Sequence, residues 1–412
     1  MMIANRQDLK AAISEAMAAV QIVDVHTHIF PAQFHNMLLW GIDEIVTYHY
    51  LVAEYFRYST LDCAEFYALP KTKQADLIWQ TLFLDRSPVS EAQRGVLTAL
   101  RILGLPIQNS LQPYRDYFNS LTLEEHIDNV FSLSGIKEVV MTNDPFDPVE
   151  RAFWEKTPNQ DPRFRASLRI DPLLVDYPSA RAILRNLGYD VGEELDNLTA
   201  AEIRRFLRDW ITKIEALYLA ASLPPDFAIE NTHAGEMVEK CILPVCEELD
   251  IPFAPMIGVK KLINKGLGLA GDSVGKMDIR VLEYLCTEYP NNKFFVTLLS
   301  RENQHELAIT ARKYGNLMIF GCWWFLNNPS LVREITLMRL ETLGLSFIPQ
   351  HSDARVLEHL IYKWNHSKQV IASALEEKYG YALENGWQLT REHIARDVAA
   401  LFETNFADFL RK

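Results

Sequence analysis

The chain has 412 residues, of which 49% are hydrophobic and 23% are charged, as expected for a folded globular protein with a sizeable core. Its formal net charge of −13 argues against nucleic acid or an anionic membrane surface as a partner, because both would repel it. A small anionic substrate stays compatible with this charge, since a local arginine cluster acts at shorter range than the net charge.

The sequence predicts a cytoplasmic protein. No apolar run approaches the roughly 18 residues of a membrane span, and the N-terminus lacks a signal-peptide pattern. The five cysteines are scattered and form no CxxC motif. Free thiols in a reducing compartment are therefore expected rather than disulfides or a zinc knuckle.

The first elements in the chain are a short amphipathic helix over 8–20 and a strand within 21–30. The strand carries His26 and His28. Because side chains alternate along a strand, both imidazoles are expected on one face, about 6.6 Å apart. Two imidazoles on one rigid face can share a metal ion. The alternative is a strand that carries two histidines without any ligand role.

A helical insertion is predicted between 31 and 130. Helical patterns cover 44–56, 63–83, 90–103 and 113–118, and no convincing strand interrupts them. A structured insertion of this length often forms a lid or a pocket wall. The sequence Thr-Tyr-His-Tyr at 47–50 stands out within it. We expect Tyr48 to pack in the core of the insertion.

From residue 135 onward, short apolar runs alternate with helical patterns. Strands are predicted over 137–142, 165–170, 216–222, 252–259, 293–299, 317–322 and 345–350, and helices over 200–217, 235–249, 278–288, 301–313 and 329–343. With the first strand this makes eight strand–helix units, which favours a closed (β/α)₈ TIM barrel over an open doubly wound sheet. No glycine-rich nucleotide loop follows the first strand, which also disfavours the open sheet.

The chain is expected to divide into four parts. They are the N-terminal helix with the first strand (1–30), the helical insertion subdomain (31–134), the rest of the barrel (135–355) and C-terminal helices packed on the barrel (356–412).

Chemistry in such a barrel lies at the carboxyl ends of the strands. Asp353 follows the last predicted strand, which in a closed barrel lies beside the first. Its carboxylate would complete a set of two nitrogens and one oxygen with His26 and His28, leaving open positions as in a catalytic metal site. The alternative role for Asp353 is to cap the helix that begins near Arg355.

Three arginines also follow predicted strands, namely Arg169, Arg301 and Arg355. Buried guanidinium groups without an anionic partner are costly, so several together favour a carboxylate or phosphate ligand. Internal salt bridges are the alternative, with Asp171, Glu302 and Asp353 as candidate partners. Trp324 would belong to the core by default, but at a strand end it could offer a flat wall to the C–H face of a sugar.

Taken together, the sequence resembles the uronate isomerase (glucuronate isomerase) family of the amidohydrolase superfamily, in particular a divergent bacterial branch. The superfamily shares the paired histidines and the closing aspartate, here His26, His28 and Asp353. The resemblance to the family spans almost the whole chain. It is carried by Thr-Tyr-His-Tyr at 47–50, Arg-Ser-Pro at 86–88, Thr-Asn-Asp-Pro-Phe at 142–146, Leu-Leu-Ser-Arg-Glu-Asn at 298–303, Phe-Gly-Cys-Trp-Trp at 320–324 and His-Ser-Asp-Ala-Arg at 351–355.

This resemblance implies an aldose–ketose isomerase of hexuronate catabolism with an amidohydrolase-type barrel. It would interconvert D-glucuronate with D-fructuronate and D-galacturonate with D-tagaturonate, through an enediol or enediolate. The resemblance also implies a zinc ion held by His26, His28 and Asp353. Aromatic helices in the insertion could bury a partner surface, and we expect a homo-oligomer.

The mechanistic hypothesis needs a base over the C1–C2 pair, a proton shuttle and an anchor for the distant carboxylate. Asp353 is assigned the base role, assisted by a substrate hydroxyl acidified by the metal. Tyr50, to which the resemblance points, is assigned the shuttle, and His49 orients the substrate. Arg169 and Arg355 would hold the C6 carboxylate or stabilise the enediolate.

Two other functions are alternatives to the isomerase hypothesis. Superfamily hydrolases commonly add histidines after the fifth and sixth strands and a lysine on the fourth, whereas this chain has Ser222, Gly258 and Ser300 near those positions. A mononuclear hydrolase, a lactonase or amidase acting on a carboxylate-bearing substrate, is therefore the weaker alternative. The other alternative is a barrel that binds a sugar acid without catalysing a reaction.

Overall fold

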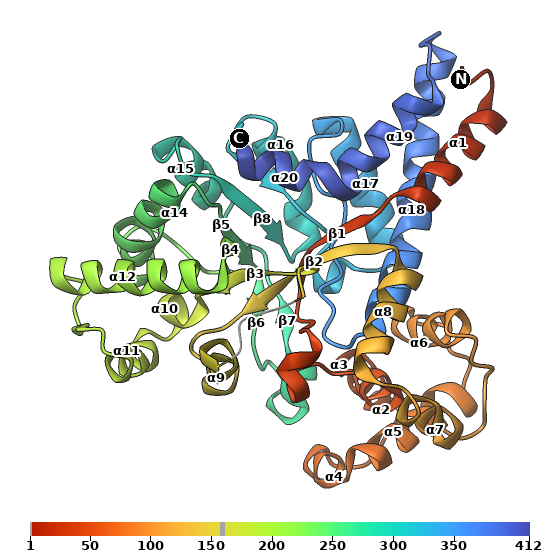
Figure 1. Ribbon diagram of the computed structural model, residues 1–412, viewed down its shortest axis with the longest axis horizontal. Coiled ribbons are helices and arrows are strands. Elements are labelled where there is room, and N and C mark those ends of the chain that lie inside the picture. The colour runs from red at the N-terminus through yellow and green to blue at the C-terminus, as the bar shows by residue number, and fades with distance from the viewer. Residues whose placement is uncertain (1, 157–160) are drawn as a thin grey trace.

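In a computed structural model that describes residues 2–156 and 161–412, parallel strands curl around a common axis (Figure 1). Hydrogen bonds join seven of them in the order β1-β2-β3-β4-β5-β8-β9. Their bounds are β1 Ile22–Thr27, β2 Ile136–Asn143, β3 Phe164–Arg169, β4 Ala216–Leu223, β5 Phe253–Ile257, β8 Phe294–Leu298 and β9 Leu317–Ile319. The predicted TIM-barrel fold is confirmed.

The eighth position of the barrel is irregular, so the prediction of a regular strand over 345–350 was wrong. Only Ile348 pairs with a neighbouring strand, through Phe320, and its carbonyl accepts a hydrogen bond from Gly321 N at 2.8 Å. Pro349 follows it and has no N–H to continue a ladder. The segment closes the ring farther along, where Asp353 N donates to the His26 carbonyl at 3.1 Å.

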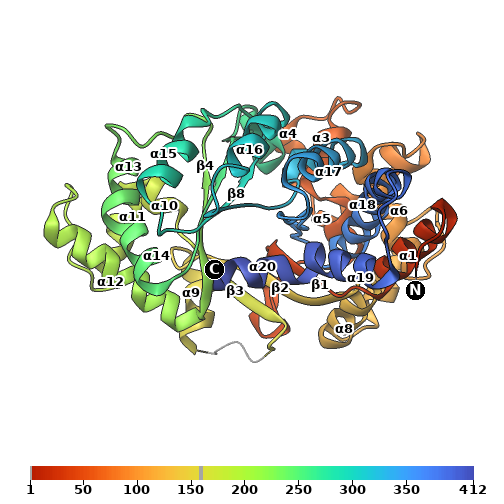
Figure 2. The same cartoon turned by 90° about the horizontal axis from the view of Figure 1, so that it is seen from above.

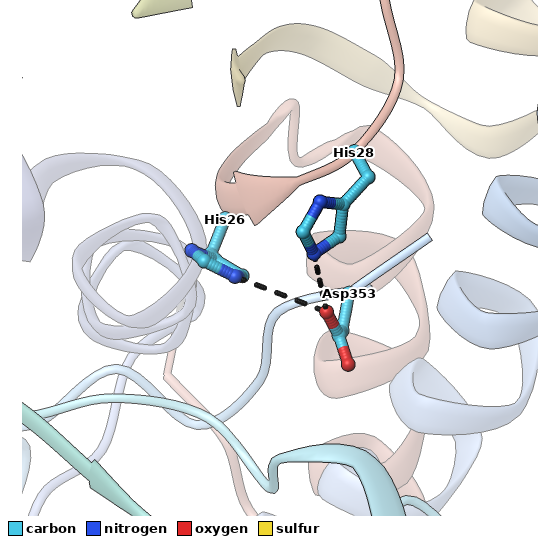
Figure 3. A group of neighbouring side chains, drawn as sticks. All are labelled: His26, His28 and Asp353. Carbon is cyan, nitrogen blue, oxygen red and sulfur yellow. Dashed lines mark ion pairs between the residues drawn. The ribbon is translucent and has the colours of Figure 1, made fainter. Parts of the chain in front are cut away.

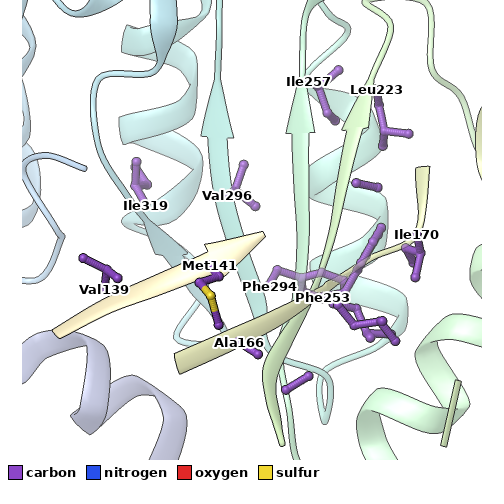
Figure 4. Packing of buried hydrophobic residues seen from close by; sticks show 14 of the residues in the cluster. Val139, Met141, Ala166, Ile170, Leu223, Phe253, Ile257, Phe294, Val296 and Ile319 are labelled. Atoms are coloured by element: carbon purple, nitrogen blue, oxygen red, sulfur yellow. The ribbon is translucent and has the colours of Figure 1, made fainter. Parts of the chain in front are cut away.

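Side chains alternate between two cores along each strand. Val139 and Met141 of β2 point outward to the helices, whereas Val140 points inward. Figure 4 shows outward-facing residues of several strands gathered in the same layer. Because both faces are buried, the strands appear in the sequence as continuous apolar runs. The inner core is completed by Phe406 and Phe409, which come from the last helix of the chain.

Helices cover the outside of the barrel, with α11 (Tyr177–Asn186) to α15 (Arg280–Glu288) on one side and α1 (Arg6–Ala19), α17 (Pro329–Leu343) and α18 (His359–Glu384) on the other (Figure 2). The α13–α14 helix contains a π-helical turn, Val238–Ile242. The helices of this layer are α9 Pro148–Lys156, α10 Asp171–Val175, α11 Tyr177–Asn186, α12 Asn197–Ile214, α13 His233–Met237, α14 Leu243–Leu249, α15 Arg280–Glu288, α16 Gln304–Ala311 and α17 Pro329–Leu343.

The fifth strand is shorter than predicted. It ends at Ile257 because Gly258 takes a φ of 128°, a value that L side chains rarely adopt. The chain then forms an antiparallel hairpin of β6 Val259–Lys260 and β7 Ser273–Val274. This hairpin rises from the carboxyl end of the barrel toward the insertion, where its loop carbonyl at Leu267 accepts a hydrogen bond from Tyr67.

The insertion after β1 is helical, as predicted, and has its own hydrophobic cluster (Figure 1). The helix expected over 44–56 is two helices, because Tyr48 adopts an extended ψ of 142°. The helix expected over 63–83 breaks before Pro70. The helices are α2 Ile42–Val46, α3 His49–Tyr55, α4 Cys63–Ala68, α5 Lys71–Trp79, α6 Glu91–Ile102, α7 Gln112–Asn119 and α8 Leu123–Ser134.

The two ends of the chain meet on the barrel. The long helix α18, His359–Glu384, packs against α1, Arg6–Ala19, and against α17 (Figure 1). The helices α19, Arg391–Ala399, and α20, Asn405–Arg411, follow and bring Phe406 and Phe409 beneath the strands. None of the helices in the described ranges is long and apolar enough to cross a membrane.

Candidate active site

His26, His28 and Asp353 converge at the carboxyl end of the barrel (Figure 3). Asp353 Oδ1 lies 3.8 Å from His26 Nε2 and 3.4 Å from His28 Nε2. One ligand atom from each of the three residues lies within 4.8 Å of the other two. Two imidazole nitrogens and one carboxylate oxygen at this spacing could hold one divalent metal ion and leave coordination positions open.

An irregularity in β1 directs the two histidines toward the cavity. Asp24 pairs with Val139 and Thr27 with Met141, so three steps along β1 match two along β2. An extra residue of this kind changes the direction in which the following side chains point. His28 lies one residue beyond the end of β1. The predicted proximity of the imidazoles holds, with ring centroids 5.5 Å apart, although the strand is not regular.

Two buried hydroxyl groups select the tautomer of His26. Its Nδ1 lies 3.3 Å from Tyr218 Oη and 3.4 Å from Thr142 Oγ1. Tyr218 donates its own proton to the Val25 carbonyl, and Thr142 donates to the Thr27 carbonyl. Each hydroxyl therefore presents a lone pair to Nδ1. The His26 proton is thus placed on Nδ1, which leaves the Nε2 lone pair directed toward Asp353, as a metal ligand requires.

The protonation states of His26, His28 and Asp353 also suit metal binding. Burial lowers the pKa of His26 to about 3 and that of His28 to about 4, so both imidazoles are neutral near pH 7. Burial alone would raise the pKa of Asp353, but its interactions with His28 and the charge of Lys363 hold that pKa below its ordinary value. Neutral imidazoles and an ionised carboxylate are the forms that bind metal.

A cavity opens directly above this group. Its wall includes two arginines, two neighbouring tryptophans and several residues of the insertion and of the β6–β7 hairpin. The lining residues are His26, His28, Tyr48, His49, Arg169, Ser222, Val259, Lys261, Leu269, Asp272, Trp323, Trp324, Asp353 and Arg355.

The two arginines of the cavity have different partners. Arg169 makes a two-point ion pair with Asp171, with both N–O distances at 2.9 Å. The Nη1 atom of Arg169 takes no part in that ion pair. Arg355 has no carboxylate within ion-pair distance among residues 2–156 and 161–412, and lies close enough to hydrogen-bond Tyr48. Of the two arginines, Arg169 is thus partly neutralised and Arg355 has no paired acid in the described part of the chain.

The structure brings most of the predicted site residues together. His49, Arg169, Trp324 and Arg355 line the cavity with the three candidate ligands. Trp324 has a φ of 46°, an uncommon conformation for a large residue.

Two predicted residues lie elsewhere. Arg301 has a half-exposed side chain that pairs with Glu334 at 2.9 Å, outside the cavity. Tyr50 lines a neighbouring cavity behind Trp324, and its buried hydroxyl has no hydrogen-bond partner in the described part of the chain. The ring of Tyr50 packs against that of Tyr48, with centroids 5.1 Å apart, and it is Tyr48 that faces the main cavity.

The sequence analysis did not predict several site residues that lie within strands or in the β6–β7 hairpin. Tyr218 and Thr142 lie within strands, and Lys261 and Asp272 belong to a hairpin that was not predicted. Two of them carried a signal, since Thr142 opens one of the motifs that marked the family resemblance and Lys261 closely follows the predicted fifth strand. Lys261 adds a third cation to the cavity wall.

Comparison with solved structures agrees with this geometry. A uronate isomerase from Bacillus halodurans C-125 superposes with a TM-score of 0.98 and is 53% identical, covering 100% of this chain and 98% of that one. The chain belongs to the uronate isomerase family. This confirms the resemblance inferred from the sequence motifs.

More distant structures share the family's fold. A glucuronate isomerase from Caulobacter crescentus has a TM-score of 0.78 at 14% identity, covering 98% of this chain and 94% of that one. A uronate isomerase from Thermotoga maritima has a TM-score of 0.75 at 13% identity, with full coverage of both chains. Neither a protein-family model nor a curated protein sequence matches the chain.

Proposed function

We propose that this member of the uronate isomerase family interconverts D-glucuronate with D-fructuronate and D-galacturonate with D-tagaturonate. The observation that carries the proposal is the convergence of His26, His28 and Asp353 in a cavity that also holds Arg169 and Arg355. Such a site combines a base for the C1–C2 pair with cations for a distant carboxylate. The 53% identity to a uronate isomerase supports it.

The metal is proposed to be Zn²⁺, held by His26, His28 and Asp353. Two nitrogens and one oxygen with open positions are a common catalytic zinc set. When bound, the ion would lower the pKa of a substrate hydroxyl beside the reacting carbons. His26 is already fixed in the metal-binding tautomer by its hydroxyl partners.

The residue roles follow from position in the cavity. Asp353, ionised at neutral pH, would take the proton from C2 and return it to C1. His49 is partly buried, its Nε2 has no hydrogen-bond partner among the described residues, and it would hydrogen-bond the substrate. Tyr50 keeps the shuttle role as a prediction. Its hydroxyl is likewise unpartnered in the described structure, but its ring contributes to the neighbouring cavity.

The proposed substrate orientation follows from the charged residues that line the cavity. The reacting end must lie at Asp353, so the C6 carboxylate lies toward the rest of the cavity wall. Arg355 is two residues from Asp353 and would stabilise the enediolate. Arg169, with its free Nη1 edge, and Lys261 would hold the carboxylate. Homo-oligomerisation and a cytoplasmic location stay predictions from the sequence.

Asp353→Asn tests the proposal. We expect turnover of D-glucuronate to fall by about 10² to 10⁴-fold, the usual contribution of a positioned base, and exchange of the C2 proton with solvent to fall with it. Both are measured by proton NMR in D₂O, with metal content determined in parallel. Arg301→Met is the control, because Arg301 lies outside the cavity, and it should keep wild-type turnover.

The same assay separates the alternatives. Near-native C2 exchange in Asp353→Asn would remove Asp353 as the base. Hydrolysis of a lactone or amide panel without isomerisation of any uronate would favour the mononuclear hydrolase instead. The missing histidines after β5 and β8 disfavour that outcome, since fewer groups would orient an attacking hydroxide.

A further inference from the structure

Lys363, in the first turns of α18, is buried directly behind Asp353. Its side chain is 2% exposed, and no acidic side chain in the described ranges lies within ion-pair distance of it. Instead, Nζ donates to the carbonyl of Ser352 and, at 3.4 Å, to the carbonyl of Asp353. The carboxylates of Asp353 and Asp24 act on the ammonium only without direct contact. Burying an ammonium in this way is costly, so its presence here calls for a functional reason.

The two carbonyls belong to the segment that closes the barrel. Asp353 has a φ of 48°, in the left-handed region that residues other than glycine adopt only when their surroundings hold them there. On one side Ser352 N donates to Asp24 Oδ1 at 3.0 Å, and on the other Asp353 N donates to the His26 carbonyl at 3.1 Å. The two N–H groups of this turn are therefore bound by Asp24 and His26, and its two carbonyl oxygens accept hydrogen bonds from Lys363.

We propose that Lys363 is a positioning residue. It holds the left-handed turn at Asp353, and thereby the direction of the Asp353 carboxylate toward His26 and His28. This inference rests on the role proposed above for Asp353 as ligand and base. The ammonium contacts the backbone of Asp353 rather than its carboxylate. Lys363 therefore acts through the geometry of the turn and does not touch the substrate.

The sign of the effect on metal binding distinguishes positioning from simple electrostatics. Removing a nearby positive charge would by itself strengthen cation binding, because like charges repel. Releasing the turn would weaken binding, because one of the three ligands is no longer preoriented. If Lys363 is a positioning residue, the second effect is larger.

Lys363→Met removes the ammonium while keeping an unbranched apolar side chain in its place. We expect Zn²⁺ affinity, measured by competition with a chelating dye, to fall at least tenfold. We also expect kcat for D-glucuronate to fall at least tenfold, with KM changed less than threefold. The zinc measurement needs no uronate turnover, so failure of this inference is separable from failure of the proposed function.

Lys368→Met is a matched control. Lys368 lies on the same helix and also donates to a backbone carbonyl, that of Val20 at 3.4 Å, but it is remote from the cavity. It should lose similar stability on thermal unfolding with unchanged Zn²⁺ affinity and kcat. Unchanged or tighter Zn²⁺ binding in Lys363→Met would overturn the proposal, as would equal effects of the two variants.

A second variant covers the case in which Lys363→Met does not fold. The cavity behind Trp324 is lined by Lys363 together with Tyr50, Glu54 and Tyr362, so it gives a small amine access to the position of Nζ. In Lys363→Ala, propylammonium should restore Zn²⁺ affinity several-fold, and tetramethylammonium, which has no N–H donor, should not. Equal rescue by both cations, or loss of the fold in both Lys363 variants but not in Lys368→Met, contradicts positioning.

Discussion

The orientation of His26 depends on single hydroxyl groups that other strands contribute. Tyr218 comes from β4 and Thr142 from β2, and both give their own protons to β1 carbonyls. These two bonds leave only acceptor lone pairs for His26 Nδ1. At this scale the position of one proton, on His26 Nδ1, leaves the Nε2 lone pair available to a metal ion.

Tyr218→Phe removes one of these two acceptors. We expect Zn²⁺ affinity to fall about tenfold, at the lower end of what an outer hydrogen-bond partner contributes, because Thr142 still accepts from Nδ1. A competition titration with a chelating dye measures it. Tyr114→Phe is the control, since its buried hydroxyl bonds to Pro106 and Gln108 in the insertion. Equal Zn²⁺ affinities in the two variants would show that Tyr218 does not orient His26.

At the scale of elements, the site depends on departures from regular structure. The extra residue in β1 directs the two imidazoles, and the irregular eighth segment brings Asp353 to them. Gly321, two residues after the end of β9, lets that segment approach closely. It has a φ of 65°, and a Cβ built on it would lie 1.7 Å from His351 Nδ1. A side chain there would push the closing segment away from β9.

Gly321→Ala should therefore destabilise the protein strongly. We expect a loss of about 3 kcal/mol or more in the free energy of unfolding, from overpacking added to left-handed strain. Gly104→Ala is the matched control, because its φ is 76°, it ends helix α6 with Leu105 N donating to the Leu100 carbonyl, and a Cβ there meets nothing within 4 Å. It should cost about 1 kcal/mol. Urea unfolding measures both, and similar losses would show that the contact with His351 can relax.

At the scale of the whole molecule, the C-terminal tail completes the barrel. α18 supplies Trp364, which donates to Asp24 at 2.8 Å, and α20 supplies Phe406 and Phe409 to the inner core. The last residues of the chain are thus packed beneath strands that come near its beginning. The barrel core is complete only when the tail has docked.

Phe406→Ala tests the role of the tail. Its ring is 4% exposed and packs in the inner core with Tyr218 and Phe295. Truncation should cost about 3 to 5 kcal/mol in the free energy of unfolding, as for other large buried rings. Trp387→Ala, at a side chain that is 65% exposed, should change stability by less than about 0.5 kcal/mol. A small loss for Phe406 would mean that the inner core does not need the tail.

The sequence by itself determined the alternation of buried strands and helices, and with it the barrel and the helical insertion. It also predicted that His26, His28 and Asp353 converge in a candidate metal site, because a closed barrel places the last strand beside the first whatever the details of each strand. Those inferences depend on hydrophobic patterning and chain order, which are properties of the sequence.

Only the tertiary structure decided where individual side chains point. It placed Tyr48 rather than Tyr50 on the main cavity, paired Arg301 with Glu334 outside it, and added Lys261 from the β6–β7 hairpin. Two local breaks contribute to these placements, namely the bend at Tyr48 between α2 and α3 and the left-handed Gly258 before the β6–β7 hairpin. Packing between distant segments stabilises such breaks. The hydrophobic periodicity of the sequence does not reveal that packing, so it cannot predict them.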